Sequence, residues 1–141
     1  MERMSFEMES RSCNEQFARV VVAVFLSRLD PTVEELDDIK TAVSEAVTNC
    51  IIHGYEGREG IIRVEAAIEG NEATVRVIDK GIGILNVKQA MEPLYTSKPS
   101  EERSGMGFSF MEAFMDELTV ESRPGEGTAV TMKKTIGRAK E

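Results

Sequence analysis

The most constraining feature of this chain is one helical pattern that runs without interruption from Thr32 to His53. Thr32-Val33-Glu34-Glu35 fits a capping box, in which a Thr and a Glu side chain satisfy free N–H groups of the first turn. Gly54 is predicted to end the helix. At about 1.5 Å per residue the helix is roughly 33 Å long, enough to cross a whole sheet. Its core face is predicted to be one apolar stripe, formed by Leu36, Ile39, Val43, Val47 and Cys50.

The remaining elements follow from the periodicity of apolar residues on either side of this helix. Strands are predicted at residues 4–9, 61–68, 73–78, 117–122 and 128–135, the last four as two hairpins. Further helices are predicted from Ser12 or Asn14, as the cap, to Leu29, and at residues 86–91 and 107–115. This order predicts an α+β fold of one domain, residues 1–141: a two-layer sandwich whose mixed, mostly antiparallel sheet carries helices on one face.

Charge excludes several classes of partner. The 141 residues carry a formal net charge of −8, whereas a nucleic-acid binder needs a basic face, and an anionic membrane surface would also repel the chain. No apolar run approaches the roughly 20 residues of a spanning helix, and the charged N-terminus does not resemble a secretory signal. Cys13 and Cys50 have no metal-binding spacing and are expected to be reduced thiols. We therefore expect a cytoplasmic protein that binds neither nucleic acid nor membrane.

Glu45 and Asn49 are the candidate chemical groups of the long helix. They lie one helical turn apart, away from the apolar stripe, so periodicity alone favours a solvated charge and a surface amide. If this side instead faces a cleft, the carboxylate could accept a proton from an attacking hydroxyl. The carboxamide oxygen could then bind Mg²⁺ beside substrate phosphates. Both interpretations stay open at this point.

Asp79, Gly81 and Gly83 follow a hydrophobic strand in the segment IDKGIGI. The glycines permit backbone conformations and close ligand approach that a Cβ would block. An ionised Asp79 at the floor of a pocket could accept a hydrogen bond from an exocyclic amine and so select adenine, although an ordinary strand-ending turn has the same composition. The segment is not a dinucleotide-binding fingerprint, and the P-loop and protein-kinase signatures are absent from the sequence.

A second glycine segment, Ser104-Gly105-Met106-Gly107, leads directly into the last apolar helix. Free amides at such a helix start suit an anion. Lys98 and Arg103 bring positive charge to the same stretch, although a flexible loop with two solvated basic residues is the alternative. Thr128 in the last hairpin could contact adenine, or it could simply be a strand threonine.

These four separated pieces together resemble the ATP-binding fold shared by DNA gyrase, heat-shock chaperone ATPases, mismatch-repair ATPases and histidine kinases. A narrower resemblance is carried by three stretches, FARVVVAVFLSRLDPTVEELDDIKTAVSEAVTNCIIHGY, EPLYTSKP and ERSGMGFSFMEAFMDEL. They are similar to the sporulation anti-sigma factors of the sigma-F type, which are also serine kinases. The resemblance covers nearly the whole chain and is far more specific than any single glycine segment.

The resemblance implies a role for each candidate residue. Glu45 would be the general base, Asn49 the Mg²⁺ ligand and Asp79 the residue that recognises adenine, with Arg103 reaching the γ-phosphate. Further contacts to ATP or ADP are expected from Gly81, Gly83, Thr96, Lys98, Ser104, Gly105, Met106, Gly107 and Thr128. Arg19 matches the position that this family uses to touch both of its protein partners, although a solvated helix arginine is an equal alternative.

The implied function is that of a homodimer that binds Mg-ATP and holds a sigma factor, thereby blocking transcription. The same protein would phosphorylate a serine of an anti-anti-sigma factor. Three alternatives stay open: a histidine-kinase-like ATPase domain, a non-catalytic ATP-fold module that sequesters a sigma factor, and a two-layer domain with an unused cleft. The first would need a dimerisation hairpin with a phosphoacceptor histidine, for which this chain has no room.

Overall fold

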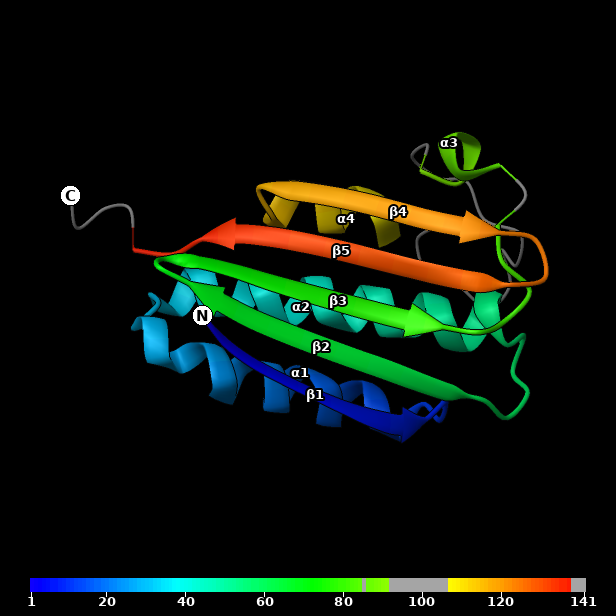
Figure 1. Ribbon diagram of the computed structural model, residues 1–141, viewed down its shortest axis with the longest axis horizontal. Helices are drawn as coiled ribbons and strands as arrows, with labels where there is room; N and C mark the ends of the chain where they lie inside the picture. Colours follow the sequence, from blue (N-terminus) through cyan, green and yellow to red (C-terminus); the bar gives the residue numbers. More distant parts are fainter. Residues whose placement is uncertain (85, 92–106, 138–141) are drawn as a thin grey trace.

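The computed structural model describes residues 1–84, 86–91 and 107–137. Within these ranges, five strands form one sheet in the order β1-β2-β3-β5-β4 (Figure 1). The strands are β1 (Glu2–Glu9), β2 (Ile61–Glu69), β3 (Glu72–Asp79), β4 (Glu117–Arg123) and β5 (Gly127–Thr135). Each neighbouring pair is antiparallel, so the sheet is antiparallel throughout rather than mixed.

Three of the helices, α1, α2 and α4, cover one face of this sheet (Figure 1). The helical segments are α1 (Cys13–Leu26), a 3-10 turn η1 (Ser27–Leu29), α2 (Val33–Asn49), a π-helical turn η2 (Cys50–Gly54), α3 (Val87–Ala90) and α4 (Gly107–Phe114). The predicted α+β two-layer sandwich is confirmed. No helix in the described ranges is long and apolar enough to cross a bilayer.

The start of α2 confirms the capping box. The Glu35 N–H donates to Thr32 Oγ1 at 3.0 Å, and the Thr32 N–H donates to Glu35 Oε1 at 2.9 Å. Ser12 is the N-cap residue of α1, one of the two predicted positions, but it makes no side-chain cap hydrogen bond, and the Asn14 amide donates to the Glu9 carbonyl at 2.8 Å. That carbonyl belongs to the strand before the helix, so Asn14 fixes the strand-to-helix turn instead.

The core lies between the sheet and the three helices. Ile39, Val43, Val47 and Cys50 of the predicted stripe are buried, whereas Leu36 at its start is only half-buried. They pack with alternate strand residues and with α4 in one cluster, which includes Ile62, Val64, Val75, Val77, Met111 and Met132. Burial of this apolar surface, at about 25 cal/mol per Å², holds the helical layer on the sheet.

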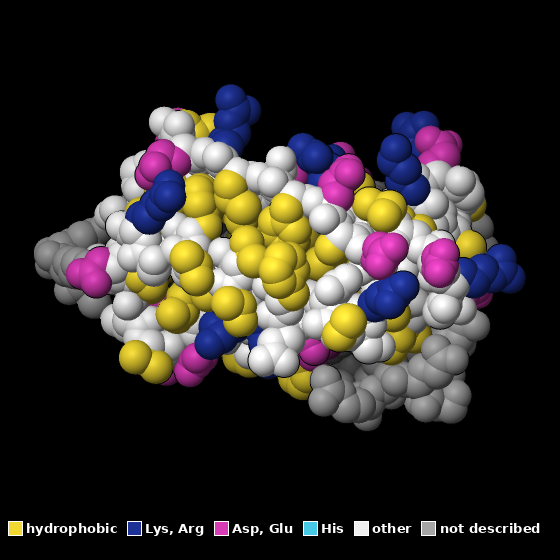
Figure 2. Space-filling model, turned by 90° about the horizontal axis from the view of Figure 1, so that it is seen from below, with side chains coloured by type: hydrophobic (Ala, Val, Ile, Leu, Met, Phe, Trp, Pro, Cys, Tyr) yellow, Lys and Arg dark blue, Asp and Glu magenta, His cyan; other side chains and the backbone are white. Residues whose placement is uncertain are grey.

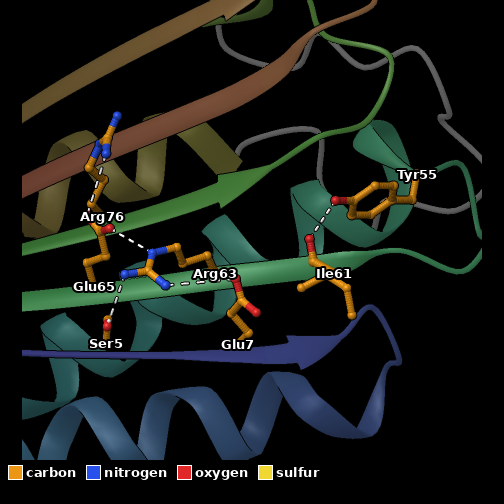
Figure 3. Close-up of polar contacts among 7 residues, drawn as sticks. All are labelled: Ser5, Glu7, Tyr55, Ile61, Arg63, Glu65 and Arg76. Atoms are coloured by element: carbon orange, nitrogen blue, oxygen red, sulfur yellow. Dashed lines mark hydrogen bonds and ion pairs between the residues drawn. The ribbon is translucent and has the colours of Figure 1, made fainter.

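The other face of the sheet is polar. Arg63 donates to Glu65 at 2.8 Å and to Ser5 at 3.1 Å, and Arg76 donates to Glu65 at 3.5 Å (Figure 3). The hydrogen bond from Arg63 outweighs partial burial and lowers the pKa of Glu65. These side chains are partly exposed, at 34–42%, and ion pairs near the surface add little stability. This face of the sheet is therefore open to solvent, and the helices cover the other face.

One end of the sheet gathers the candidate residues. β1 and β3 end there, β5 begins there, and the C-terminal end of α2 lies behind it (Figure 1). Asp79 is the last residue of β3 and faces Thr128 in the register of β5. Because Asn49 ends α2 at this same end, the fold brings together residues that are far apart in the sequence.

Candidate functional site

Glu45 and Asn49 lie side by side against the start of α4. A Cβ built on Gly107 would stand 3.3 Å from Glu45 Oε2 and 3.3 Å from Asn49 Oδ1. Both side chains are half-buried, and the start of α4 lies against α2 beside them. Glu45 is thus only partly exposed, whereas periodicity alone favours a fully solvated charge. Gly107 is suited to this position, since a side chain there would press on both polar groups.

Asp79 is almost fully buried, with an exposed fraction of 4%. The Gly81 N–H donates to its Oδ1 at 2.9 Å. Burial raises the pKa of Asp79, while hydrogen bonds from the Gly81 and Thr128 amides and the Cys50 thiol act in the opposite direction. A buried carboxylate held in this way is suited to receive a further hydrogen-bond donor from a ligand.

Cys50 lies between the Glu45–Asn49 pair and Asp79. It follows Asn49 in the chain, is 3% exposed, and has its thiol against the Asp79 carboxylate. Burial, together with the nearby Asp79 charge, raises the pKa of this thiol well above its usual value. The thiol therefore stays protonated and can act as a donor to Asp79. This contact could not be predicted from the sequence, which indicates only that Cys50 lies on the core face of the helix.

Close backbone packing explains the glycines around Asp79. A Cβ on Gly81 would lie 2.0 Å from the Gly54 carbonyl oxygen, and one on Gly54 would lie 2.8 Å from Asp79 Oδ2. The Ile82 N–H donates to that same Gly54 carbonyl at 2.9 Å. Gly54 ends the helical segment as predicted, but it does so without a left-handed conformation. What requires a glycine there is the approach of Asp79.

Gly83 has a left-handed backbone with φ of 77°, and a Cβ there would also meet the Arg123 carbonyl at 2.0 Å. The Gly125 N–H donates to the Ile82 carbonyl at 2.6 Å. The segment after β3 is therefore fastened to the turn between β4 and β5. Both proposed nucleotide-contacting glycines, Gly81 and Gly83, are thus required by packing around the site, whatever else they contact.

Tyr55 also stabilises the end of the sheet at which Asp79 lies, through two hydrogen bonds of its hydroxyl. Its hydroxyl donates to the Ile61 carbonyl at 2.5 Å (Figure 3) and accepts from the Lys80 N–H at 2.8 Å. Burial raises the pKa of this phenol, so it remains a donor at neutral pH. Tyr55 thereby ties the start of β2 to the residue that follows Asp79. This role was not predicted from the sequence. The one available signal was an aromatic residue directly after Gly54.

Thr128 is 9% exposed and has its hydroxyl 2.7 Å from the hydroxyl of Ser122. Ser122 also accepts from the Ile84 N–H at 2.7 Å. The segment after β3, strand β4 and strand β5 therefore meet at one serine. Sequence reasoning missed Ser122 too, because one hydroxyl in a strand carries no pattern.

Arg19 lies on α1 at a groove of about 470 Å³ between α1 and α2. Its guanidinium stands 3.7 Å from Glu15, whose carboxylate accepts from the Ser44 hydroxyl at 2.7 Å. The Arg19 side chain is 38% exposed, so it remains available to a partner. Lys40 and Asp37 line the same groove, so it carries charges of both signs.

The structure thus brings Glu45, Asn49 and Gly107 into one cluster, and Asp79, Gly81, Gly83 and Thr128 around the end of β3. The other predicted contacts lie outside the described residues: Thr96, Lys98, Arg103, Ser104, Gly105 and Met106. Their roles stay predictions.

The side-chain oxygens of Asn49 and Glu45 suit a metal ion that is also bound by a substrate, rather than one bound by protein side chains alone. Among residues 1–84, 86–91 and 107–137, no three His, Cys, Asp or Glu side chains gather as a metal-binding group. Mg²⁺ in phosphate-binding sites commonly takes one or two protein oxygens and completes its shell with water and phosphate. The Asn49 carboxamide beside Glu45 can supply such an oxygen.

Comparisons with known proteins agree with this geometry. The profile of the histidine kinase-like ATPase domain family matches residues 9–134. A protein named anti-sigma F factor from Clostridium beijerinckii is 62% identical over 133 residues, which cover 94% of this chain and 93% of the relative. Another of that name, from Thermoanaerobacter sp., is 60% identical over 97% of this chain and 96% of its own length.

A solved structure supports the fold. The crystal structure of the RsbU and RsbW domains of a Mycobacterium tuberculosis protein matches with a TM-score of 0.68 over 96% of this chain, at 20% identity. This chain covers 32% of that longer protein. Because the sequence identity over nearly the whole chain is high for the anti-sigma F factors, the chain belongs to that family, within the histidine kinase-like ATPase domains.

Proposed function

We propose that this protein binds and inhibits a sigma factor of the sigma-F type and phosphorylates a serine of its anti-anti-sigma partner, using Mg-ATP. The observation that carries the proposal is the convergence of Glu45 and Asn49 at the sheet end that holds Asp79. The names of its relatives support the sigma-factor partner. A protein with these two proposed partners would act in the cytoplasm, and its proposed setting is sporulation.

The chemistry follows from the positions of the side chains. Asp79 would accept a hydrogen bond from the adenine amine, which orients the nucleotide with its phosphates toward α2. Glu45 would then take the proton of the incoming serine hydroxyl as the serine oxygen bonds to the γ-phosphorus; the bond from that phosphorus to the β,γ-bridging oxygen breaks, and ADP leaves. Asn49 would hold Mg²⁺, which when bound neutralises charge on the phosphates. Arg103, assigned from the family resemblance, would stabilise the departing charge.

The release of the product has an electrostatic basis. A phosphoserine carries nearly two negative charges, and this chain has a formal net charge of −8. The phosphorylated partner would therefore be repelled, and the anti-sigma factor would be free to bind the sigma factor again. Arg19 and Lys40, on the groove between α1 and α2, are the described basic groups that we assign to partner contact.

The test is transfer of label from γ-³²P-ATP to the anti-anti-sigma protein of the same organism, together with sigma-factor binding. The kinase proposal expects serine phosphate in the partner and none without Mg²⁺. Sigma binding with no transfer would support the non-catalytic module instead. Transfer to a histidine would support the histidine-kinase-like alternative, and absence of both activities would contradict the proposal.

We further propose that the chain forms a homodimer through β1 and α1. Phe17, Val20 and Val24 of α1 are 52%, 47% and 66% exposed and share one helix face. Phe17 packs edge-on against Phe6 of β1, with ring centroids 5.7 Å apart. Figure 2, seen from this side, shows a contiguous apolar patch. β1 is also an edge strand of the sheet, and a second copy of the chain could cover both features.

Val24→Asp is expected to convert the protein to a monomer. Burying an unpaired carboxylate costs several kcal/mol, so dimerisation should weaken at least about hundredfold. Sedimentation equilibrium of the wild type and the variant measures this. Val33→Asp is the matched control, since Val33 is 79% exposed at the start of α2 and lies outside the patch. A dimer that survives Val24→Asp unchanged would place the interface elsewhere.

Asp79→Asn is expected to weaken ATP binding by about 1.5–3 kcal/mol, the scale of a hydrogen bond to a charged group. Isothermal titration calorimetry with Mg-ATP measures the loss. Asp116→Asn is a suitable control for the change of charge, because Asp116 lies at the opposite end of β5, near Thr135. A change in affinity no larger than that of the control would remove Asp79 from the site.

Asp79→Asn is also expected to change how the stability of the nucleotide-free protein depends on pH. The folded state raises the pKa of Asp79 above 3.8, so the folded chain binds its proton more tightly than the unfolded chain does. The contribution of Asp79 to stability is thus full below about pH 3.8 and is lost as pH rises through the raised pKa. Chemical denaturation across this range should show a loss in the wild type that is absent in Asp79→Asn. A parallel pH dependence in the two proteins would contradict this.

A further inference from the structure

Ser122 is the point where three backbone segments around the proposed adenine site meet. Its Oγ lies 2.7 Å from the Ile84 nitrogen, 2.9 Å from the Gly127 carbonyl oxygen and 2.7 Å from Thr128 Oγ1. Ile84 follows the glycine segment after β3, and Gly127 and Thr128 begin β5. All three contacts fall within normal hydrogen-bond distance.

The protons available to these contacts decide their direction. The Ile84 N–H can only donate, and the Gly127 carbonyl can only accept. Ser122 has one proton, so it can donate to Gly127 or to Thr128 but not to both. If it donates to Gly127, the Thr128 hydroxyl donates to Ser122, and each of the three contacts has a proton. If it donates to Thr128, the contact with Gly127 has none. The first arrangement is therefore favoured.

This arrangement fixes the hydrogen-bonding character of Thr128. Its proton is used on Ser122, so its oxygen offers only lone pairs to a ligand. Thr128 faces Asp79 directly in the register of β5 and β3. Asp79 and Thr128 are then two acceptors on paired residues of neighbouring strands. A ligand that carries an amine, with two N–H groups on one nitrogen, matches them, whereas a ligand with a carbonyl oxygen at that position meets lone pairs.

We propose that Ser122 is a positioning residue for nucleotide specificity: it commits Thr128 to act as an acceptor and so favours 6-amino over 6-oxo purine nucleotides. This inference rests on the proposed nucleotide site. It assigns to Ser122 a role separate from that of Asp79, because Ser122 acts through the direction of the Thr128 hydroxyl.

The test compares ATP with inosine triphosphate, which differs in having a 6-oxo group and a proton on N1. In Ser122→Ala, the Thr128 hydroxyl can turn and donate to a 6-oxo group. The ratio of ATP to ITP affinity, measured by calorimetry with Mg²⁺, is expected to fall about fivefold to tenfold, the scale of one hydrogen bond. Ser122→Thr keeps the hydroxyl on a strand and should restore the ratio. Thr119→Ala, an exposed hydroxyl on the same strand, should leave it unchanged.

The ratio separates this role from simple support of the fold. If Ser122 only fastened the backbone, Ser122→Ala would weaken ATP and ITP equally, and that result would overturn the inference. An unchanged ratio with unchanged affinities would overturn it as well. If the wild type prefers ATP and Asp79→Asn weakens it, but Ser122→Ala keeps the ratio, the inference fails and the proposed function stands. If the wild type binds neither nucleotide, both fail.

Discussion

Glu45→Gln is expected to reduce phosphoryl transfer to the anti-anti-sigma partner by about 10²–10⁴-fold, the usual contribution of a general base. Glutamine keeps the size of the side chain but cannot take the serine proton. ATP affinity should stay within a few-fold of the wild type, because no contact to adenine is removed. Single-turnover transfer of label, at saturating ATP and partner, measures the chemical step.

Glu112→Gln is the matched control for this change of charge. Glu112 lies on α4, the helix that covers Glu45, but it is exposed. The Glu112→Gln variant should leave the rate of phosphoryl transfer unchanged. If Glu45→Gln transferred phosphate at the wild-type rate, the carboxylate would not be the base, and its place beside Asn49 and Gly107 would need another explanation. Sigma-factor binding by the variant in the presence of ATP should persist, which also shows that the variant is folded.

Asn49→Ala is expected to abolish the part of nucleotide affinity that depends on Mg²⁺. Loss of a direct ligand should cost at least as much as loss of a ligand's hydrogen-bond partner, which commonly weakens metal binding by about 10–100-fold. Calorimetric titrations with ATP in Mg²⁺ and in EDTA separate the two contributions. The variant should bind ATP in EDTA as the wild type does.

The control for Asn49→Ala is Asn71→Ala, which changes an amide in the exposed turn between β2 and β3. It should bind Mg-ATP normally. Thermal unfolding should also be similar for the three proteins, since Asn49 lies outside the apolar cluster. Mg-ATP affinity that is unchanged in Asn49→Ala would rule out this residue as the metal ligand.

Local patterns were sufficient to predict most of the fold. The capping box at Thr32 and the hairpin turn at Gly70-Asn71 depend on neighbours within a few residues, so the sequence displays them directly. The apolar stripe of α2 was equally visible, because a buried helix face repeats every 3.6 residues. The cap position at Ser12 was predicted, but its side chain makes no cap hydrogen bond, and Asn14 instead donates to the Glu9 carbonyl of the preceding strand.

The functional site could be predicted less well from local sequence patterns. The environment of Glu45 depends on where α4 packs, and α4 lies about sixty residues further along the chain. Periodicity could place Glu45 off the core stripe but could not tell solvent from a covered side. Gly54 was assigned as a helix stop, whereas Asp79 is what requires a glycine there. Resemblance to a family supplied the roles that local patterns could not.

Glu45, Asn49 and Asp79 are proposed to line one Mg-ATP site. The most direct measurement is a crystal structure of the protein with Mg²⁺ and a non-hydrolysable ATP analogue. It should place the adenine amine within about 3.2 Å of the Asp79 carboxylate and the metal ion on the Asn49 carboxamide oxygen. An analogue bound at another place, with Asp79 still covered by protein and Asn49 distant from the phosphates, would contradict the account.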